Sequence, residues 1–379
     1  MNENSFVVPE AAGTLFKTQS VPQPGSCNVA AGTQSPEKSL EFIGKSTFAP
    51  NASWTLGGAF LYDNALKHFV RYANSFVKSM HVNCISGAPV CLWTLDWFAS
   101  RPLSAPLPIV NTIKEHLSHR VAFQFDFDNP FLTEEDCADS VGNIFLSVIT
   151  TMPGGNAFVC VASDVLADYI RAKFPQLKLI AGENRAVVQN ARGNVDYYKK
   201  ALEKFERVIV HPLDATDAPF LKKLINKEGV PAERLEVSVN DTCLRGCPLR
   251  VEHLRALAEK RKFPYDGERL KNLKSILAQA HCDDVTPDGP KTLGECAAVL
   301  TRDEVRALAE LGIVHLRIQA KKLRNELTYI WQLGEWLVSD DPALWHKKAA
   351  FINGAAVDLV CPESRVKSGL NPFVKRKYE

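Results

Sequence analysis

The stretch NAFVCVASDVLADYIRAKFPQLKLIAG (156–182) decides the fold class of this chain. Short runs rich in Val, Ile and Leu begin and end it, at 156–163 and 177–182. Between them, residues 164–174 carry apolar side chains at helical spacing, which predicts an amphipathic helix. Two strands joined by a helical crossover lie parallel in one sheet, so the stretch predicts a strand–helix–strand unit of an α/β protein.

The same alternation extends to both sides of this unit. Helical patterns separate five further runs with strand character, namely HVNCI (81–85), RVAFQFDF (120–127), RVIVHP (207–212), RLEVSVN (234–240) and IVHLRIQ (313–319). An eighth strand between 260 and 310 would close a (β/α)8 barrel, which usually needs roughly 250 residues. An open doubly wound sheet is the alternative, but GAP (87–89) is not the glycine-rich loop of that fold. We therefore predict an α/β fold of the (β/α)8 TIM-barrel-like kind.

Composition divides the 379 residues into three parts. Residues 1–45 are rich in Gly, Pro, Ser, Thr and Gln, which predicts a flexible N-terminal tail. Residues 46–338 hold the predicted barrel, including an amphipathic helix at 60–79. Residues 339–379 are predicted to form a helical and basic C-terminal extension, since 345–379 contains seven Lys or Arg against three Asp or Glu.

Charge and cysteine content exclude several classes of protein. The 45 Lys and Arg nearly balance the 43 Asp and Glu, which argues against a general electrostatic nucleic-acid binder. No apolar run approaches the roughly 18 residues of a membrane span, and the N-terminus has no signal-peptide pattern. Ten Cys are too few for a disulfide scaffold of this length. We therefore expect a cytoplasmic protein that does not act in a membrane; a protein partner or a homo-oligomer remains open.

The densest chemical signal is VSVNDTCLRGCPLRVEH (237–253). Cys243 and Cys247 follow a strand in a turn that contains Gly and Pro, and Cys282 and Cys296 come later in the chain. Four thiolates form the ligand set of a [4Fe–4S] cluster and also of a structural zinc site. We predict that these four Cys bind one metal centre; Cys137 is an alternative ligand.

Side chains near this cysteine pair are candidates for cofactor binding. Asn240, Arg250 and His253 lie within ten residues of Cys243 or Cys247. They are suited to donate hydrogen bonds to cluster sulfurs, and Arg250 and His253 are also suited to bind an anionic substrate group. The remaining Cys have simpler explanations, since Cys84 and Cys160 lie in apolar strands and are expected in the core.

Polar residues at the ends of predicted strands are candidates for catalysis, because active sites of such barrels lie at the carboxyl ends of the strands. The catalytic candidates are Asp126, Asp128, His211 and Arg317. Asp126 and Asp128 are spaced to share one face of a strand, where one of them would serve as a base, and His211 is a candidate proton carrier. Loop hydrogen bonding by Asp128 and a core position for His211 are the alternatives. Other polar groups at such positions are Asn129, Glu183, Asn184, Arg185 and Gln319, with Trp97 and Arg101 after the first of these strands.

Two segments resemble the U32 family, the collagenase-like peptidases with a TIM-barrel-like core. They are VSVNDTCLRGCP (237–248) and LAELGIVHLRIQAKKLRNELTYIWQL (308–333), in the order in which the family has them. The resemblance implies a [4Fe–4S] cluster on four Cys and oxygen-independent hydroxylation, of ubiquinone precursors in some relatives and of RNA in others. Where the family has Glu-Gly-Arg, this chain has Gln319, Ala320 and Lys321. A peptidase activity is the weakest implication, since the sequence has no HExxH, no GxSxG and no ordered triad.

Three functions remain open from the sequence. The first is a [4Fe–4S]-dependent barrel enzyme of U32 type that carries out oxygen-independent hydroxylation, or a related redox modification, of RNA or a small molecule. The second is a barrel with structural zinc or no metal that acts as a binding or assembly protein. The third is a hydrolase or lyase that uses Asp and His as acid and base.

Overall fold

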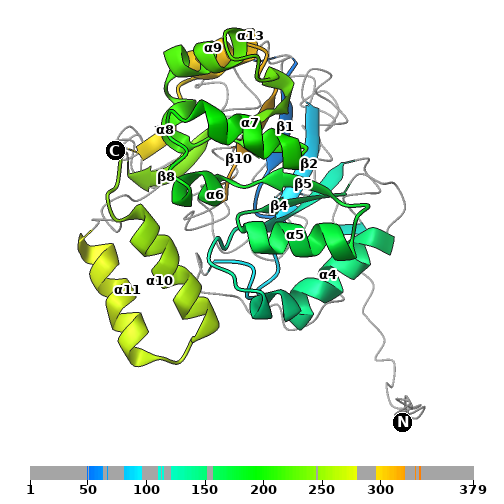
Figure 1. Cartoon of the computed structure of the whole chain (residues 1–379), viewed down its shortest axis with the longest axis vertical. Coiled ribbons are helices and arrows are strands. Elements are labelled where there is room, and N and C mark those ends of the chain that lie inside the picture. Colours follow the sequence, from blue (N-terminus) through cyan, green and yellow to red (C-terminus); the bar gives the residue numbers. More distant parts are fainter. Residues whose placement is uncertain are drawn as a thin grey trace, which may run out of the picture.

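Eight parallel strands form a closed barrel in the computed structural model of this protein (Figure 1). The order around the barrel is β1, β2, β3, β4, β5, β6, β7 and β10, and β10 pairs with β1 to close it. The strands are β1 Ser53–Leu56, β2 His81–Gly87, β3 Ala122–Phe127, β4 Ala157–Val161, β5 Lys178–Ala181, β6 Arg207–Ile209, β7 Leu235–Ser238 and β10 His315–Ile318. The predicted (β/α)8 TIM-barrel-like fold is thereby confirmed.

The structure describes Ala49 and residues 51–62, 66, 81–95, 110–111, 113–114, 121–151, 157–244, 246–279, 296–320, 329 and 333. The predicted N-terminal tail, the C-terminal extension and most of the predicted helix at 60–79 lie outside these residues. Within the described part of the chain, no helix is both long and apolar enough to cross a bilayer.

Helices follow most of the strands and cover the outside of the barrel (Figure 1). They are α4 Ser140–Thr151, α5 Asp164–Lys173, α6 Glu183–Val188, α7 Val195–Lys204, α8 Pro212–Ala215, α9 Ala218–Asn226 and α13 Arg302–Glu310, with short 3-10 helices η1 Glu135–Ala138 and η2 Ala232–Arg234. Side-chain caps set the start of several of them. Ser163 caps α5, Asn194 caps α7 and Thr301 caps α13, each by accepting a backbone hydrogen bond in the first turn.

The eighth strand of the barrel is not where the sequence pattern suggested. It is β1, Ser53–Leu56, which precedes the seven predicted strands. The segment between 260 and 310 does contain a strand, β9 Cys296–Val299, but this strand pairs antiparallel with β8 Asn240–Leu244 outside the barrel. The SWTL run of β1 is only four residues long, too short to display a period.

A second correction concerns the predicted strand 234–240. It is divided at Val239 into β7 and β8, so Asn240 begins the two-stranded ribbon and does not end a barrel strand. Helices α10 Arg250–Lys262 and α11 Gly267–Gln279 then form a hairpin, which lies to one side of the barrel in Figure 1.

The main hydrophobic core lies between the outer face of the barrel and the helices. On β3, Phe123, Phe125 and Phe127 belong to this core, and Gln124 and Asp126 alternate with them. Because side chains alternate between the two faces of a strand, Gln124 and Asp126 point into the barrel. The inside of this barrel is therefore partly polar, whereas branched apolar residues usually fill such a barrel.

Candidate functional site

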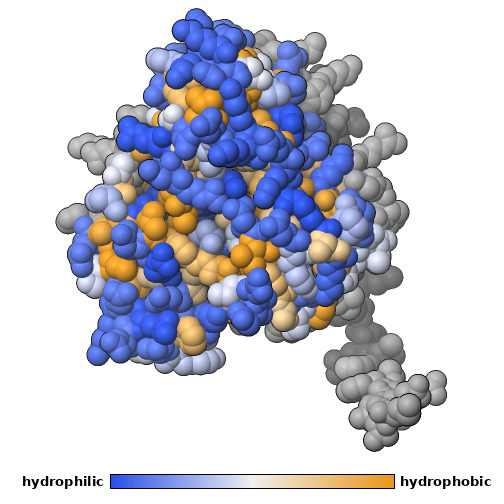
Figure 2. All heavy atoms as spheres, in the orientation of Figure 1, coloured by the Kyte–Doolittle hydropathy of each residue, from blue (hydrophilic) through white to orange (hydrophobic). Residues whose placement is uncertain are grey.

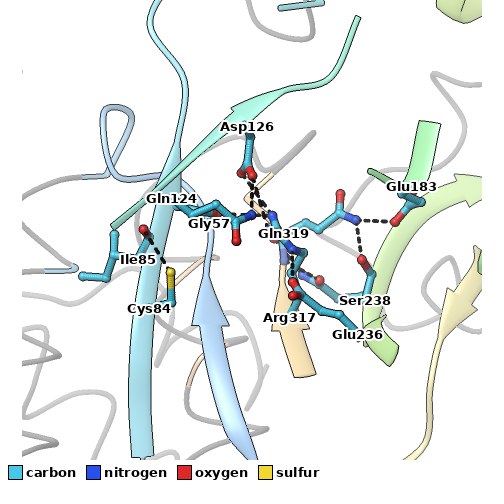
Figure 3. Close-up of polar contacts among 12 residues, drawn as sticks. Gly57, Cys84, Ile85, Gln124, Asp126, Glu183, Glu236, Ser238, Arg317 and Gln319 are labelled. Carbon is cyan, nitrogen blue, oxygen red and sulfur yellow. Dashed lines mark hydrogen bonds and ion pairs between the residues drawn. The ribbon is translucent and has the colours of Figure 1, made fainter. Parts of the chain in front are cut away.

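Arg317 of β10 is the centre of the polar group inside the barrel (Figure 3). Its Nε donates to Oε1 of Glu236 on β7 at 2.8 Å, and its Nη1 donates to Oδ2 of Asp126 on β3 at 3.0 Å. Nη1 also lies 3.2 Å from Oγ of Ser86 on β2. Three strands, β2, β3 and β7, thus supply hydrogen-bond partners to the guanidinium of Arg317 on β10. Asp126 keeps 21% of its side chain exposed, whereas Arg317 and Glu236 are buried.

Glu236 is shared by two cations. Nη1 of Arg207, on β6, lies 3.3 Å from Oε2 of Glu236 and 2.9 Å from Nδ1 of His315. Burial raises the pKa of Glu236, but Arg317 and Arg207 outweigh it and hold this pKa below its ordinary value. Burial and the charge of Arg207 lower the pKa of His315. We conclude that Glu236 is ionised and that His315 is neutral near pH 7.

The rest of the barrel interior is less polar. Cys160 and Ile180 form a small apolar cluster with Ile209, and Phe158 packs against it. Burial raises the pKa of Cys84 to about 12, so this thiol is protonated at neutral pH. Cys84 and Cys160 are both buried, as predicted for core thiols, but neither belongs to the outer core: Cys84 lies close to the charged groups inside the barrel, and Cys160 lies in this small apolar cluster.

Gln319 connects the barrel to the cysteine-bearing ribbon. Its Nε2 donates to Oε2 of Glu183, the first residue of α6, at 2.6 Å and to Oγ of Ser238 at 2.7 Å (Figure 3). Asn240 makes two hydrogen bonds to the backbone of Gln319, one to its carbonyl at 2.8 Å and one from its N–H at 2.7 Å. The start of β8 is therefore fastened to the carboxyl end of β10, at the mouth of the barrel.

Arg250 brings positive charge next to Cys243 at this mouth. Its Nη1 lies 2.8 Å from Oδ2 of Asp241, and its Nη2 lies 2.8 Å from Oε1 of Glu183. Burial lowers the pKa of Arg250, but Asp241, Cys243 and Glu183 together raise it well above its ordinary value. Arg250 therefore lies close enough to Cys243 to interact with it electrostatically.

Three of the four predicted metal ligands belong to this ribbon or to the turn after it. Cys243 is buried on β8, Cys247 is partly exposed, and Gly246 between them has a φ of +65°, which glycine adopts without strain. Antiparallel pairing puts the backbone of Cys296 opposite Leu244, the neighbour of Cys243. Cys282 and the side chain of Cys296 lie outside the described residues.

Cys243 and Cys247 thus supply two soft donors on the ribbon and in the turn after it. Within the described part of the chain, no group of three or more His, Cys, Asp or Glu side chains is arranged to hold a metal ion. The buried position of Cys243, the nearby charge of Arg250 and the strand pairing of Cys296 fit soft thiolate donors on this ribbon. Cys137 is buried on η1, where its Sγ lies 3.6 Å from the carbonyl oxygen of Thr133.

His211 and Asp128 have structural contacts. Nδ1 of His211 accepts a hydrogen bond from the backbone of Leu213, which caps α8, and its proton therefore sits on Nε2. Burial and the positive charges of Arg250 and Arg192 lower the pKa of His211 to about 4, so it is uncharged at neutral pH. Asp128 accepts from the backbone of Leu95 at 2.9 Å, which is the loop contact considered as its alternative.

The other strand-end candidates also hold loops and helices in place. Asn129 bonds the backbone of Leu92 and Phe131, Asn184 donates to the carbonyl of Asp128, and Arg185 pairs with Asp164 at 2.8 Å. His253 is buried on α10, and Trp97 and Arg101 lie outside the described residues. A hollow of about 410 Å³ lies beside the cysteine turn, lined by Arg192, Leu213, Thr216, Asp217, Pro219 and Gly246.

Sequence reasoning missed several groups of this site, above all Glu236, Arg207 and Asp241. A signal for Glu236 was present, because polar residues alternate with apolar ones in LEVS and in HLRI. In a barrel ringed by helices both faces of a strand are covered, so such alternation marks a polar interior and not a solvent-exposed face.

Comparisons with known proteins yield one distant similarity in structure. The sequence matches no protein-family model, and no curated protein matches it. Among solved structures, the fold is similar to that of the U32 peptidase Mk0906, with 12% sequence identity and a TM-score of 0.42. The alignment covers 78% of this chain and 98% of that chain. This protein is therefore a barrel with a distant structural similarity to a U32 peptidase.

Proposed function

We propose that this protein is an enzyme with its active site at the mouth of the barrel and a [4Fe–4S] cluster on Cys243, Cys247, Cys282 and Cys296. The proposed activity is an oxygen-independent hydroxylation, or a related redox modification, of RNA or a small molecule. The observation that carries the proposal is the buried Cys243 beside Arg250, on a ribbon fastened to the barrel mouth by Asn240.

A guanidinium close to Cys243 supports a thiolate-bound group. Arg250 pairs with Asp241 and Glu183 and also interacts electrostatically with Cys243. A [4Fe–4S] cluster, when bound, supplies one-electron transfer at a potential set by hydrogen bonds and burial. Arg250 is positioned to supply such electrostatic stabilisation to the sulfurs.

The interior of the barrel supports a polar substrate. Asp126 is partly exposed, and Arg317 orients its carboxylate through two contacts, at 3.0 and 3.3 Å. Glu236 holds Arg317 from the opposite side. In this proposal Asp126 accepts a hydrogen bond from a substrate hydroxyl or amide, and Arg317 keeps that acceptor correctly oriented.

The test is metal analysis of protein purified without oxygen. We expect about four iron atoms and four sulfide ions per chain, with visible absorption of a [4Fe–4S] cluster. Cys243→Ser combined with Cys247→Ser should abolish iron loading. Cys84→Ser is the matched control, because Cys84 is equally buried but lies inside the barrel; it should load iron normally.

Two results would contradict the proposal. Full iron content in the Cys243→Ser, Cys247→Ser variant would remove these residues from the ligand set. One zinc ion per chain and no iron, in protein expressed with both metals available, would instead support a structural zinc site in a binding or assembly protein.

A further inference from the structure

The hairpin of α10 and α11 concentrates positive charge. Residues 250–279 contain eight Lys or Arg against four Asp or Glu, whereas the whole chain has 45 against 43. Although the whole chain is nearly neutral, this hairpin has a local excess of basic residues. Arg255, Lys262, Lys271 and Lys274 are exposed, and the last two are three residues apart on one face of α11.

The tip of the hairpin carries two exposed aromatic side chains. Tyr265 is 97% exposed and Phe263 is 42% exposed, and the guanidinium of Arg269 lies 4.0 Å from the centre of the Phe263 ring. No aliphatic residue appears among the large exposed hydrophobic side chains of the described hairpin. The open ring of Tyr265 among cations suits stacking on nucleobases, whereas membrane insertion also relies on aliphatic side chains.

The hairpin is attached to the barrel domain next to its tip and along its inner side. Arg261 donates to the backbone carbonyls of Thr94 and Leu95, and Lys262 pairs with Asp136 at 2.7 Å. Leu254, Leu257 and Leu273 pack with Leu95 and Val187 of the barrel domain. Figure 2 accordingly shows hydrophobic residues between the hairpin and the barrel and mainly hydrophilic ones on the lower part of the hairpin.

The distance from the tip to the site favours a polymeric ligand. Helix α10 begins three residues after Cys247, and its 13 residues extend about 20 Å. A small metabolite held at the cysteine turn cannot also touch Tyr265, whereas a nucleic-acid strand can reach both places.

We propose that the α10–α11 hairpin binds an unpaired stretch of nucleic acid, with Tyr265 stacked on a base and Lys271 and Lys274 on phosphates. The choice of RNA rests on the proposed function, whereas the binding surface does not. Binding through this surface requires no metal, so it is measurable whether or not the cluster forms.

Fluorescence anisotropy of the full chain with a labelled, mixed-sequence, single-stranded RNA tests this inference. Tyr265→Ala should weaken binding about tenfold, and Tyr265→Phe, which keeps the ring, by no more than about twofold. Lys271→Glu with Lys274→Glu should lower the slope of log affinity against log salt by about 1.4, since each phosphate contact on a single strand contributes about 0.7. Lys200→Glu with Lys222→Glu is the charge-matched control on α7 and α9, away from the hairpin (Figure 1), and should bind more tightly than the hairpin double variant.

Several outcomes would overturn the inference. Absence of RNA binding by the unaltered chain would do so, and so would equal losses in the hairpin and control double variants. Binding to anionic lipid vesicles that depends on Tyr265, with RNA binding unchanged by Tyr265→Ala, would assign the tip to a membrane surface. If single-stranded DNA of the same sequence binds equally well, the hairpin is confirmed as a nucleic-acid-binding surface, but the choice of RNA is wrong. The Cys243→Ser, Cys247→Ser variant should keep its RNA affinity, so a failure of cluster loading is distinguishable from a failure of this surface.

Discussion

At the scale of single residues, the buried Glu236 is the most consequential side chain of the barrel interior. It is fully buried, and both of its oxygens face guanidinium groups, Arg317 at 2.8 Å and Arg207 at 3.3 Å. Its negative charge compensates two buried cations. A buried ion pair contributes little compared with a well-packed apolar substitute, but breaking one leaves an uncompensated charge in the interior.

We therefore predict that Glu236→Gln lowers the free energy of unfolding by about 3–5 kcal/mol, because it leaves Arg317 and Arg207 short of negative charge. Urea unfolding at pH 7 measures this loss. Asp168→Asn breaks an exposed ion pair with Arg171 on α5 and should change stability by no more than about 1 kcal/mol. If Glu236→Gln lowers the free energy of unfolding no more than Asp168→Asn does, the buried ion pairs of Glu236 are not needed for stability and the prediction is wrong.

At the scale of elements, the β8–β9 ribbon is the unit that carries the cysteines. Its start is fastened to β10 by the two hydrogen bonds of Asn240, whereas its pairing with β9 shifts register between Asp241 and Leu244. The position of Cys243 relative to the barrel therefore depends on the side chain of Asn240 together with the backbone hydrogen bonds of Val239 to Arg317 and Leu300.

Asn240→Ala should remove both of these bonds, lower stability by about 2 kcal/mol and reduce iron loading of the anaerobically purified protein. Thr301→Ala serves as a control for general destabilisation. It removes the cap of α13, with an expected loss of about 1 kcal/mol, but leaves the ribbon anchored, so iron content should stay normal. Equal iron content in the two variants, measured with their melting temperatures, would contradict the anchoring role of Asn240.

At the scale of the whole molecule, buried neutral histidines make stability depend on pH. The pKa of His211 is lowered to about 4, chiefly by burial, and that of His315 is lowered as well. A histidine whose folded-state pKa lies below its unfolded value of about 6.5 binds its proton more readily in the unfolded chain. Between the folded-state and the unfolded-state pKa of such a histidine, the free energy of unfolding falls as the pH falls.

Acidification from pH 7 to pH 5 should cost about 2 kcal/mol through His211 alone. His211→Asn, which keeps an acceptor for the helix cap, should flatten this part of the pH profile. Urea midpoints at the two pH values provide the measurement, and an unchanged pH slope in His211→Asn would contradict the assignment. Below about pH 4.5, the lowered pKa of Glu236 adds a further loss as its carboxylate takes up a proton.

Part of the site was predictable from local sequence, and part of it was not. Arg317, Gln319 and Asp126 were expected at the carboxyl ends of strands, and the structure brings them to the mouth and interior of the barrel. Glu236 was not predicted as a site residue, because its strand was interpreted only as a hydrophobic run ending at Asn240. His211 and Asp128 were singled out by position, but their neighbours, namely Leu213 and Leu95, give them structural contacts.

The sequence by itself determined the class of fold, because strand and helix periods are local properties of a few consecutive residues. It did not identify β1, whose four residues are too few to display a period. Only the tertiary structure decided which polar groups meet. Arg317 contacts Glu236 from 81 residues away and Asp126 from 191 residues away. Such contacts arise when the barrel closes and brings inward-facing positions of distant strands together, and no local pattern encodes that distance.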